Sequence, residues 1–213
     1  MRRMAHPSSR RGRRPADQGD TERGIRLAAL RRFADQGFDR ASLRDIAADA
    51  GVDAALISYK FGSKLGLWKA VVERVGTVTL EQIAAAAAAK PDRGERPLAA
   101  AMEALIDVYC ANDTVPRFLL RDAGHDPQRA AWVFDHVSQP LLDHYLPLIR
   151  AAHDAGEMRA PIPEMAFLTF AYGVAVNVVR RDMLTGYAPQ LANDDEFRAA
   201  LCDTLIAPQL RHG

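Results

Sequence analysis

Apolar residues recur at helical spacing over the first third of the chain. Between residues 25 and 33 the apolar positions lie three or four residues apart, and the same spacing returns between residues 43 and 50. This spacing places the apolar side chains on one face of an α-helix. Together with the apolar stretches that follow, it predicts successive N-terminal helices over residues 21–36, 42–50, 53–61 and 63–89.

Glycines and capping residues mark the ends of these helices. Gly37 and Gly51 stand where a left-handed residue commonly ends a helix. Ser42, Asp53 and Ser63 carry side-chain oxygens that can cap a helix N-terminus by accepting a backbone N–H. Two short helices joined by a tight turn form a helix-turn-helix, and the second and third helices fit this description.

The remaining two thirds of the chain shows helical patterns and no strand signal. Pro140 and Pro147 are expected to kink or split one of these helices, because proline lacks the backbone N–H that a helix interior needs. The predicted helices are residues 95–111, 114–123, 127–154, 162–185 and 194–206. We therefore predict an all-α fold.

Charge is distributed unevenly along the chain. Residues 1–75 hold 16 Lys and Arg against nine Asp and Glu, whereas residues 76–213 hold 12 against 18. A basic N-terminal part on an acidic body indicates that the first part meets a polyanion. Residues 1–19, which carry six arginines, are expected to form a flexible basic arm, with Arg13 and Arg14 as candidate DNA contacts. A merely solubilising tail is the alternative.

The short helix over residues 53–61 divides its side chains between two faces. Val52, Ile57 and Phe61 are predicted to face inward. Small residues on the outer face would let the helix sit deep in a DNA major groove. The polar groups there, and Lys64 at the start of the next helix, are placed to meet phosphates, unless Tyr59 is a core aromatic and Lys60 only solvated. The expected outer face consists of Ala54, Ala55, Ser58, Tyr59 and Lys60.

The segment "TERGIRLAALRRFADQGFDRASLRDIAADAGVDAALISYKFGSKLGLWKAVVE", residues 21–73, resembles the DNA-binding region of the tetracycline-repressor (TetR) family of transcriptional regulators. The resemblance implies a helical body, a homodimer, a palindromic operator on double-stranded DNA and usually a small-molecule inducer. The sequence also departs from the family pattern at three positions: Arg32 stands where the family usually has Leu, Asp53 where Ser is common, and Lys60 where His or Tyr is usual. By resemblance, the DNA-contacting positions are Ser42, Arg44, Ala54, Ala55, Ser58, Tyr59, Lys60 and Lys64.

These patterns define a domain plan. After the arm of residues 1–19, we expect a helix-turn-helix DNA-binding domain over residues 20–67, with the helix-turn-helix itself at 42–61. Residues 68–213 would form a larger helical bundle for ligand binding and dimerisation.

The body carries no motif of enzyme chemistry. We find no nucleophile motif, no Gly-rich phosphate loop and no His pair at metal-binding spacing, so we expect no enzyme activity, metal or cofactor. Two distant cysteines and no membrane-spanning stretch favour a cytoplasmic protein. Aromatic residues could line a pocket for a small apolar or amphipathic ligand, although any one of them is more often plain core: Trp68, Tyr109, Phe118, Trp132, Phe134, Phe167, Phe170 and Tyr172.

Residues 165–179 are apolar on every side, as in a helix that is buried all round. We expect Leu168, Tyr172 and Val179 to pack on the body and the smaller residues to meet a second subunit, unless the body buries both sides. The expected dimer interface comprises Ala171, Gly173, Ala175, Val178, Phe197, Leu201 and Leu205.

The sequence thus favours a ligand-responsive repressor that binds DNA as a homodimer. One alternative keeps the DNA binding but places control in a protein partner instead of a small molecule. A second alternative is an enzyme or scaffold with a vestigial helix-turn-helix, against which the basic arm and the intact outer face argue.

Overall fold

The computed structural model describes residues 15–90, 94–122, 126–158 and 162–210, except that the side chains of residues 15–18 and 122 are not described. The described part is helical and contains no β-strand, only one isolated antiparallel bridge between Met158 and Leu210. The all-α prediction is confirmed.

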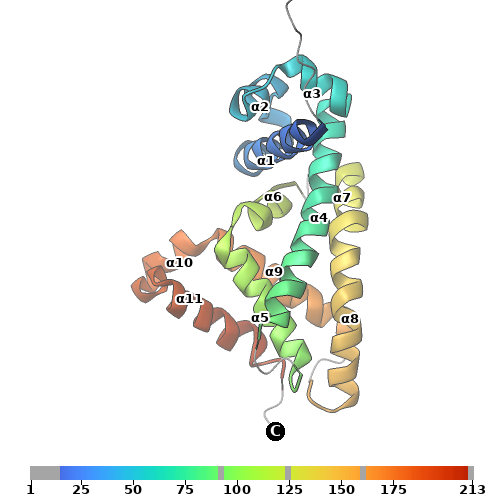
Figure 1. Cartoon of the computed structure of the whole chain (residues 1–213). Helices are drawn as coiled ribbons and strands as arrows, with labels where there is room; N and C mark the ends of the chain where they lie inside the picture. The colour runs from blue at the N-terminus through green and yellow to red at the C-terminus, as the bar shows by residue number, and fades with distance from the viewer. Residues whose placement is uncertain (1–14, 91–93, 123–125, 159–161, 211–213) are drawn as a thin grey trace, which may run out of the picture.

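Three helices form the upper unit in Figure 1. They are α1 (Pro15–Arg40), α2 (Leu43–Ala50) and α3 (Ala54–Phe61). α1 begins six residues before the expected cap at Thr21, so residues 15–19, which we assigned to the arm, are helical. We predicted that Gly37 ends the first helix; instead it kinks α1 with a φ of 79°, and a last helical turn continues to Arg40.

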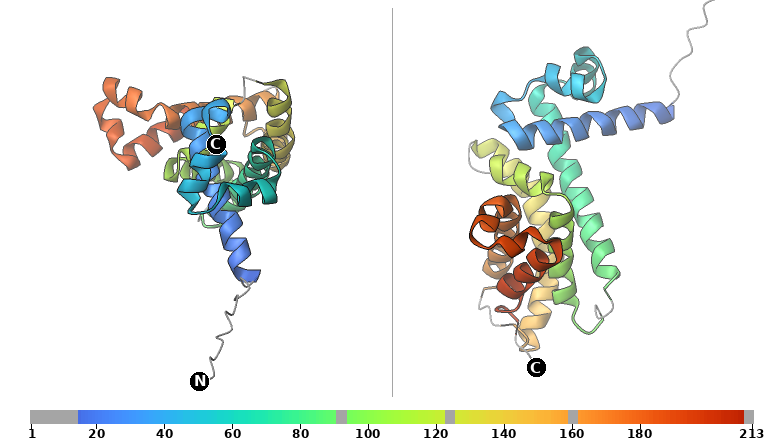
Figure 2. Two further views of the ribbon diagram at one scale, coloured as in Figure 1. Left: turned by 90° about the horizontal axis from the view of Figure 1, so that it is seen from above. Right: turned by 90° about the vertical axis from the view of Figure 1, so that its left-hand side faces the viewer.

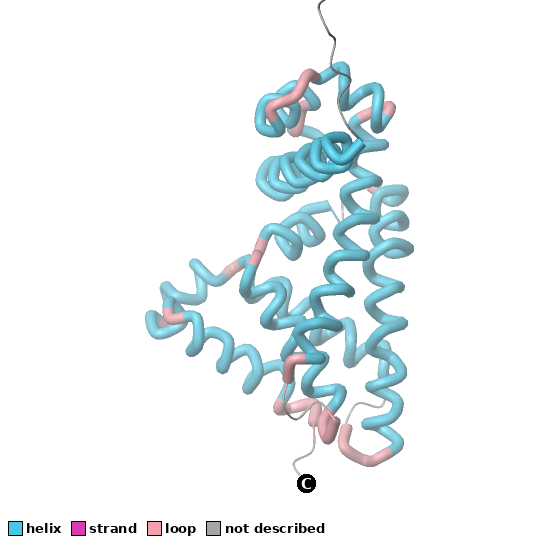
Figure 3. Tube along the Cα trace, in the orientation of Figure 1, coloured by secondary structure: helices cyan, strands magenta, loops and turns pink. Residues whose placement is uncertain are grey.

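The long helix α4 (Lys64–Ala88) leaves this unit and runs down into the body (Figures 1 and 2). The domain boundary that we expected after residue 67 therefore falls inside a continuous helix. The body contains α5 (Pro97–Ala111), α6 (Thr114–Asp122), α7 (Pro127–Val133), α8 (Gln139–Asp154), α9 (Pro163–Val179), α10 (Arg181–Tyr187) and α11 (Asp194–Leu201). Figure 3 shows the short loops that join them.

The helices predicted for the body are present, but some of them are divided or joined differently from the prediction. A π-helical turn at Phe134–Ser138 joins α7 to α8, and Pro140 lies directly after that turn, at the start of α8. Pro147 lies inside α8 without ending it. The single helix predicted over residues 162–185 is divided at Arg180, and α11 ends in a second π-helical turn, Cys202–Ile206.

A cluster of aromatic rings joins the upper unit to the body. Phe33 and Phe38 come from α1, Trp68 from α4 and Phe118 from α6, with centroids 6.0 to 6.4 Å apart in the contacting pairs. Phe33, Trp68 and Phe118 are fully buried. Burial of rings of this size is a large apolar contribution, so α6 and the upper unit are packed as one core.

Polar contacts reinforce this junction. Nη1 of Arg121, on α6, donates to the carbonyl oxygen of Ala34 at 3.2 Å, and Arg117 pairs with Asp35 at 3.1 Å. Both partners lie near the C-terminal end of α1, where the last carbonyl groups lack helical partners and favour a cation. The body therefore holds the upper unit through α6 as well as through α4.

Candidate DNA-binding surface

The helix-turn-helix is built by the caps that the sequence indicates. Ser42 Oγ accepts from the N–H of Asp45 at 3.1 Å, and Asp53 Oδ1 accepts from the N–H of Ala55 at 2.7 Å. Gly51 ends α2 with a φ of 65°, a left-handed conformation that glycine adopts without strain. These local interactions begin α3 directly after the turn, and the predicted bounds of α2 and α3 are confirmed.

The outer face of α3 is open to solvent. Ile57 is fully buried beneath the helix, whereas Ala55 and Ser58 are exposed and Tyr59 is 86% exposed. The alternative that Tyr59 is a core aromatic is therefore wrong. Ala54 is half-buried against the core, so it contributes less to the outer face than we expected.

Lys60 does not project freely from α3. Its Nζ lies 2.7 Å from the Glu22 carboxylate on α1, and its side chain is only 16% exposed. The hydrogen bond from Lys60 lowers the pKa of Glu22, so the carboxylate stays ionised. Glu22 also pairs with Arg26 at 3.5 Å. Lys60, which we expected to be free to bind phosphate, instead forms an ion pair that holds α3 against α1.

Lys64 is likewise turned inward. Its Nζ donates to the carbonyl oxygens of Asp39 and Ala41 at 3.2 and 3.1 Å and lies 4.6 Å from the centroid of the Phe38 ring. The ammonium satisfies carbonyl groups in the last turn of α1 and directly after it, and makes a cation–π contact. The expectation that this ammonium is free for a phosphate is corrected, although its helix N-terminus still faces solvent through exposed Ser63.

Beside α3, the first turn of α2 offers an exposed cation. Arg44 is exposed, and Ser42, which caps the helix, is half-buried. Arg32, whose presence departs from the resemblance, forms a two-pronged ion pair with Asp49, with a second contact of 2.8 Å. This pair ties α1 to α2 and gives the departure a structural reason. Arg13 and Arg14 lie outside the described residues.

The expected pocket residues do not form one site. Trp68 and Phe118 belong to the aromatic junction, Phe170 is core, and Phe134 is 53% exposed. Trp132 stacks on His136 with a centroid distance of 4.1 Å, so it too is engaged elsewhere. Only three of the eight aromatics, Tyr109, Phe167 and Tyr172, line a common cavity, an apolar one of about 80 Å³ between α5, α6, α8 and α9.

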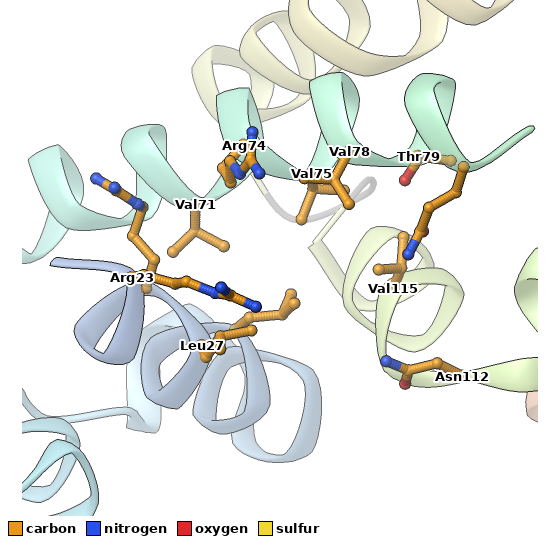
Figure 4. Close-up of a pocket in the computed structure, with 12 residues that line it drawn as sticks. Arg23, Leu27, Val71, Arg74, Val75, Val78, Thr79, Asn112 and Val115 are labelled. Carbon is orange, nitrogen blue, oxygen red and sulfur yellow. The ribbon is translucent and has the colours of Figure 1, made fainter. Parts of the chain in front are cut away.

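A larger cleft lies where sequence reasoning did not place one. It has a volume of about 600 Å³ and separates α1 from α4, with the α5–α6 connection at one end (Figure 4). Its lining includes Arg23, Arg26 and Arg74 together with aliphatic residues. The sequence does place arginines beside apolar positions in both helices. These residues come together only because α1 and α4 cross in the folded protein.

The expected dimer residues lie mostly inside the protomer. Ala175, Val178, Phe197 and Leu201 are all buried within it. Gly173 faces Leu205 of the same chain, because a Cβ on Gly173 would come within 2.9 Å of Leu205 Cδ2. The assignment of these residues to a dimer interface is therefore corrected, because the small residues of α9 allow the C-terminal segment of the same chain to pack closely against it.

The opposite face of α9 is exposed instead. Met165, Leu168, Tyr172 and Val176 are 39 to 56% exposed and lie three or four residues apart, which aligns them in a stripe along the helix. We call these four residues the α9 stripe. Leu168 and Tyr172, which we expected to pack on the body, belong to it, so the two faces of α9 are the reverse of the prediction.

Two further properties concern the described residues. They contain no group of three or more His, Cys, Asp or Glu that could hold a metal ion. None of the described helices has the length and hydropathy that crossing a membrane requires.

Comparison with known proteins agrees with this geometry. Residues 25–71 match the model of bacterial regulatory proteins of the tetR family. The transcriptional activator FasR of Mycolicibacterium smegmatis is 33% identical over 151 residues, which cover 64% of this chain and 61% of FasR. The chain thus matches about three fifths of the length of that relative.

Solved structures share the fold over nearly the whole chain. A TetR family transcription regulator from Marinobacter aquaeolei superposes with a TM-score of 0.68 at 18% identity, covering 92% of this chain and 100% of that one. The fatty acid degradation regulator FadR from Bacillus halodurans gives 0.65 at 16% identity, covering 92% and 99%.

An open helix-turn-helix on a helical body, with a matching sequence, is the architecture of DNA-binding transcriptional regulators. Residues 25–71 thus carry the DNA-binding region of the tetR family, and the described fold is the one that solved TetR family regulators share.

Proposed function

We propose that this protein binds a palindromic operator as a homodimer and that a small-molecule ligand changes its affinity for that operator. The observation that carries the DNA half is the open outer face of α3, where Ala55, Ser58 and Tyr59 are exposed while Ile57 anchors the helix from below. Small side chains would let the helix approach base edges, and the exposed Tyr59 hydroxyl and Arg44 guanidinium are available to phosphates.

The α9 stripe supports the homodimer. A contiguous apolar patch on an otherwise polar surface marks an interaction site. A two-fold axis would set the stripe of one protomer against that of its partner, because a self-complementary patch closes into a dimer. Two copies of α3 would then lie on one face of the duplex and would match a palindrome.

We propose the domain plan in a revised form. The DNA-binding unit would comprise α1, α2, α3 and the first turns of α4, and the body would supply the dimer surface and the ligand site. Repression is what the family resemblance implies, whereas the relative FasR is called an activator. The position of the operator relative to the promoter decides between the two outcomes, and operator binding is common to both.

Selection of duplexes from a random pool, followed by fluorescence anisotropy, tests the proposal. We expect an enriched palindrome that two protomers bind together, and at least tenfold weaker binding to a single half-site. Recovery of no common sequence would contradict operator recognition. If one protomer bound an asymmetric sequence, the homodimer would be wrong while DNA binding would stand.

A protein partner in place of a small ligand remains the second candidate function, because the α9 stripe could receive another helical protein. Sedimentation of the purified chain separates the two, since a monomer at micromolar concentration would leave the stripe free for such a partner.

A further inference from the structure

The cleft between α1 and α4 combines an apolar floor with positive charge. Leu27 and Leu30 of α1 face Val71, Val75 and Val78 of α4, and Val115 closes one end. Figure 4 shows Arg23 at the end opposite Asn112, with Leu27 and Val71 between the two helices. A volume of about 600 Å³ lies within the range of small-molecule sites.

The three arginines of the cleft are available to an anion. Arg23 and Arg74 are exposed and form no ion pair with any described residue. Arg26 pairs with Glu22 at 3.5 Å and lies 6.0 Å from the centroid of the Phe61 ring, and Glu22 is itself held by Lys60 at 2.7 Å. None of the described residues that line the cleft carries a carboxylate, so Arg23 and Arg74 have no counter-charge in its wall. Three guanidinium groups beside an aliphatic surface favour a ligand that is anionic at one end and apolar along its body.

We propose that this cleft binds an amphipathic anion, with a carboxylate or phosphate headgroup against Arg23, Arg26 and Arg74 and an apolar chain along the valines and leucines. The polar residues at the other end, Gln82 and Asn112, would meet the far end of the ligand or its water shell.

The position of the cleft gives such a ligand a route to DNA binding. One wall is α1, which carries the helix-turn-helix, and the other is α4, which runs into the body. A ligand that contacts both walls would favour one angle between them, and so shift the population of DNA-binding conformations. Arg26, Glu22 and Lys60 also form a continuous chain of ion pairs from the cleft to α3. This regulatory consequence depends on the proposed function, whereas ligand binding itself does not.

Isothermal titration calorimetry on the full-length protein without DNA tests the site. The probes are decanoate, decyl phosphate and decanol, which share a ten-carbon chain and differ in the headgroup. We expect decanoate or decyl phosphate to bind, and decanol to bind at least about tenfold more weakly, because it offers the arginines no charge. The stronger of the two anions identifies the preferred headgroup.

Two variants locate the binding. Arg23→Gln with Arg74→Gln should weaken anion binding by about tenfold without loss of helicity, because both side chains are exposed. Val78→Phe should obstruct the cleft and weaken the binding of all three probes. Arg180→Gln, which removes an exposed arginine that does not line the cleft, is the control and should leave binding unchanged.

Three results would overturn the proposal. They are equal affinities for decanol and decanoate, equal anion affinities of the wild type and the double arginine variant, and no binding of either anion. If the double variant weakened only DNA binding, Arg23 and Arg74 would be phosphate contacts instead. Failure of operator selection would leave these calorimetric results intact, so the two proposals fail independently.

Discussion

The ammonium of Lys60 on α3 donates to the carboxylate of Glu22 on α1 across 2.7 Å. Because the positive charge of Lys60 is balanced within the protein, it adds little to the field that a phosphate backbone meets. The same contact fixes the tilt of α3 against α1, so Lys60 serves the DNA-binding surface by positioning it.

Replacing Lys60 should therefore reduce the number of counterions released on DNA binding by less than replacing Arg44 does. We expect Arg44→Gln to reduce the slope of log affinity against log salt by about 1, and Lys60→Met to reduce it by less than about half of that. Glu22→Gln, which frees Lys60, should tighten binding to any duplex. Anisotropy titrations at several salt concentrations measure these slopes. Equal slopes for Lys60→Met and Arg44→Gln would mean that the ion pair opens on DNA.

Tyr59→Phe should weaken binding to the operator and to unrelated DNA by similar factors of about three to ten, because a hydroxyl that contacts phosphate reads no base sequence. Tyr187→Phe, at an equally exposed tyrosine on α10, should change neither affinity. Competition titrations with both duplexes provide the measurement. A loss confined to the operator would assign Tyr59 to a base edge.

Tyr172→Arg and Val176→Arg should each yield a helical monomer. Both residues lie in the α9 stripe and are 53% and 44% exposed, so a charge there disturbs a subunit interface more than the protomer core. Analytical sedimentation gives the mass, and Tyr187→Arg is the control. Dimers that persist in both stripe variants would place the interface elsewhere.

Gly66→Ala should destabilise the turn between α3 and α4. A Cβ at Gly66 would lie 2.0 Å from the carbonyl oxygen of Phe61, whereas one at Gly24, in α1, meets nothing within 4 Å. We expect Gly66→Ala to lower the free energy of unfolding by about 1–3 kcal/mol, and Gly24→Ala to raise it by roughly 0.5–1 kcal/mol. Chemical denaturation followed by circular dichroism measures both. A neutral Gly66→Ala would show that the turn can shift.

Asp107→Asn should destabilise the protein at neutral pH and have little effect in acid. Asp107 pairs with Lys90 at 2.6 Å and with Arg198, which joins α5 to the end of α4 and to α11. Burial raises the pKa of Asp107, but the hydrogen bonds from Arg198 and Lys90 outweigh burial and leave the pKa below its usual value.

A lowered pKa makes the ionised carboxylate a stabilising group above its unfolded-state pKa of about 3.9, and that stabilisation disappears as the pH falls through the lower folded-state value. We therefore expect a difference of about 1 kcal/mol between wild type and Asp107→Asn at pH 7, from the loss of partly exposed ion pairs. Urea titrations from neutral pH down to the most acidic pH at which the wild type still folds compare the two proteins, and the difference should shrink as the pH falls. A difference that persisted in acid would assign the effect to packing.

The sequence by itself determined the local architecture of the DNA-binding unit. Ser42, Gly51 and Asp53 act on residues within four positions of themselves, through caps and a left-handed turn, so their effect is readable from short-range spacing. The same holds for the buried position of Ile57 and the open outer face of α3, because helical periodicity alone separates them.

Tertiary structure decided which partner each ambiguous side chain takes. Lys60 and Lys64 could equally serve phosphates or the protein, and only the placement of α1 beside them supplies Glu22 and the carbonyl groups of Asp39 and Ala41. Residues 165–179 are apolar on all sides, so periodicity could not say which face the body covers; the C-terminal segment settles it by placing Leu205 against Gly173. The cleft between α1 and α4 exists only because two helices distant in the sequence cross, and no local pattern encodes such a crossing.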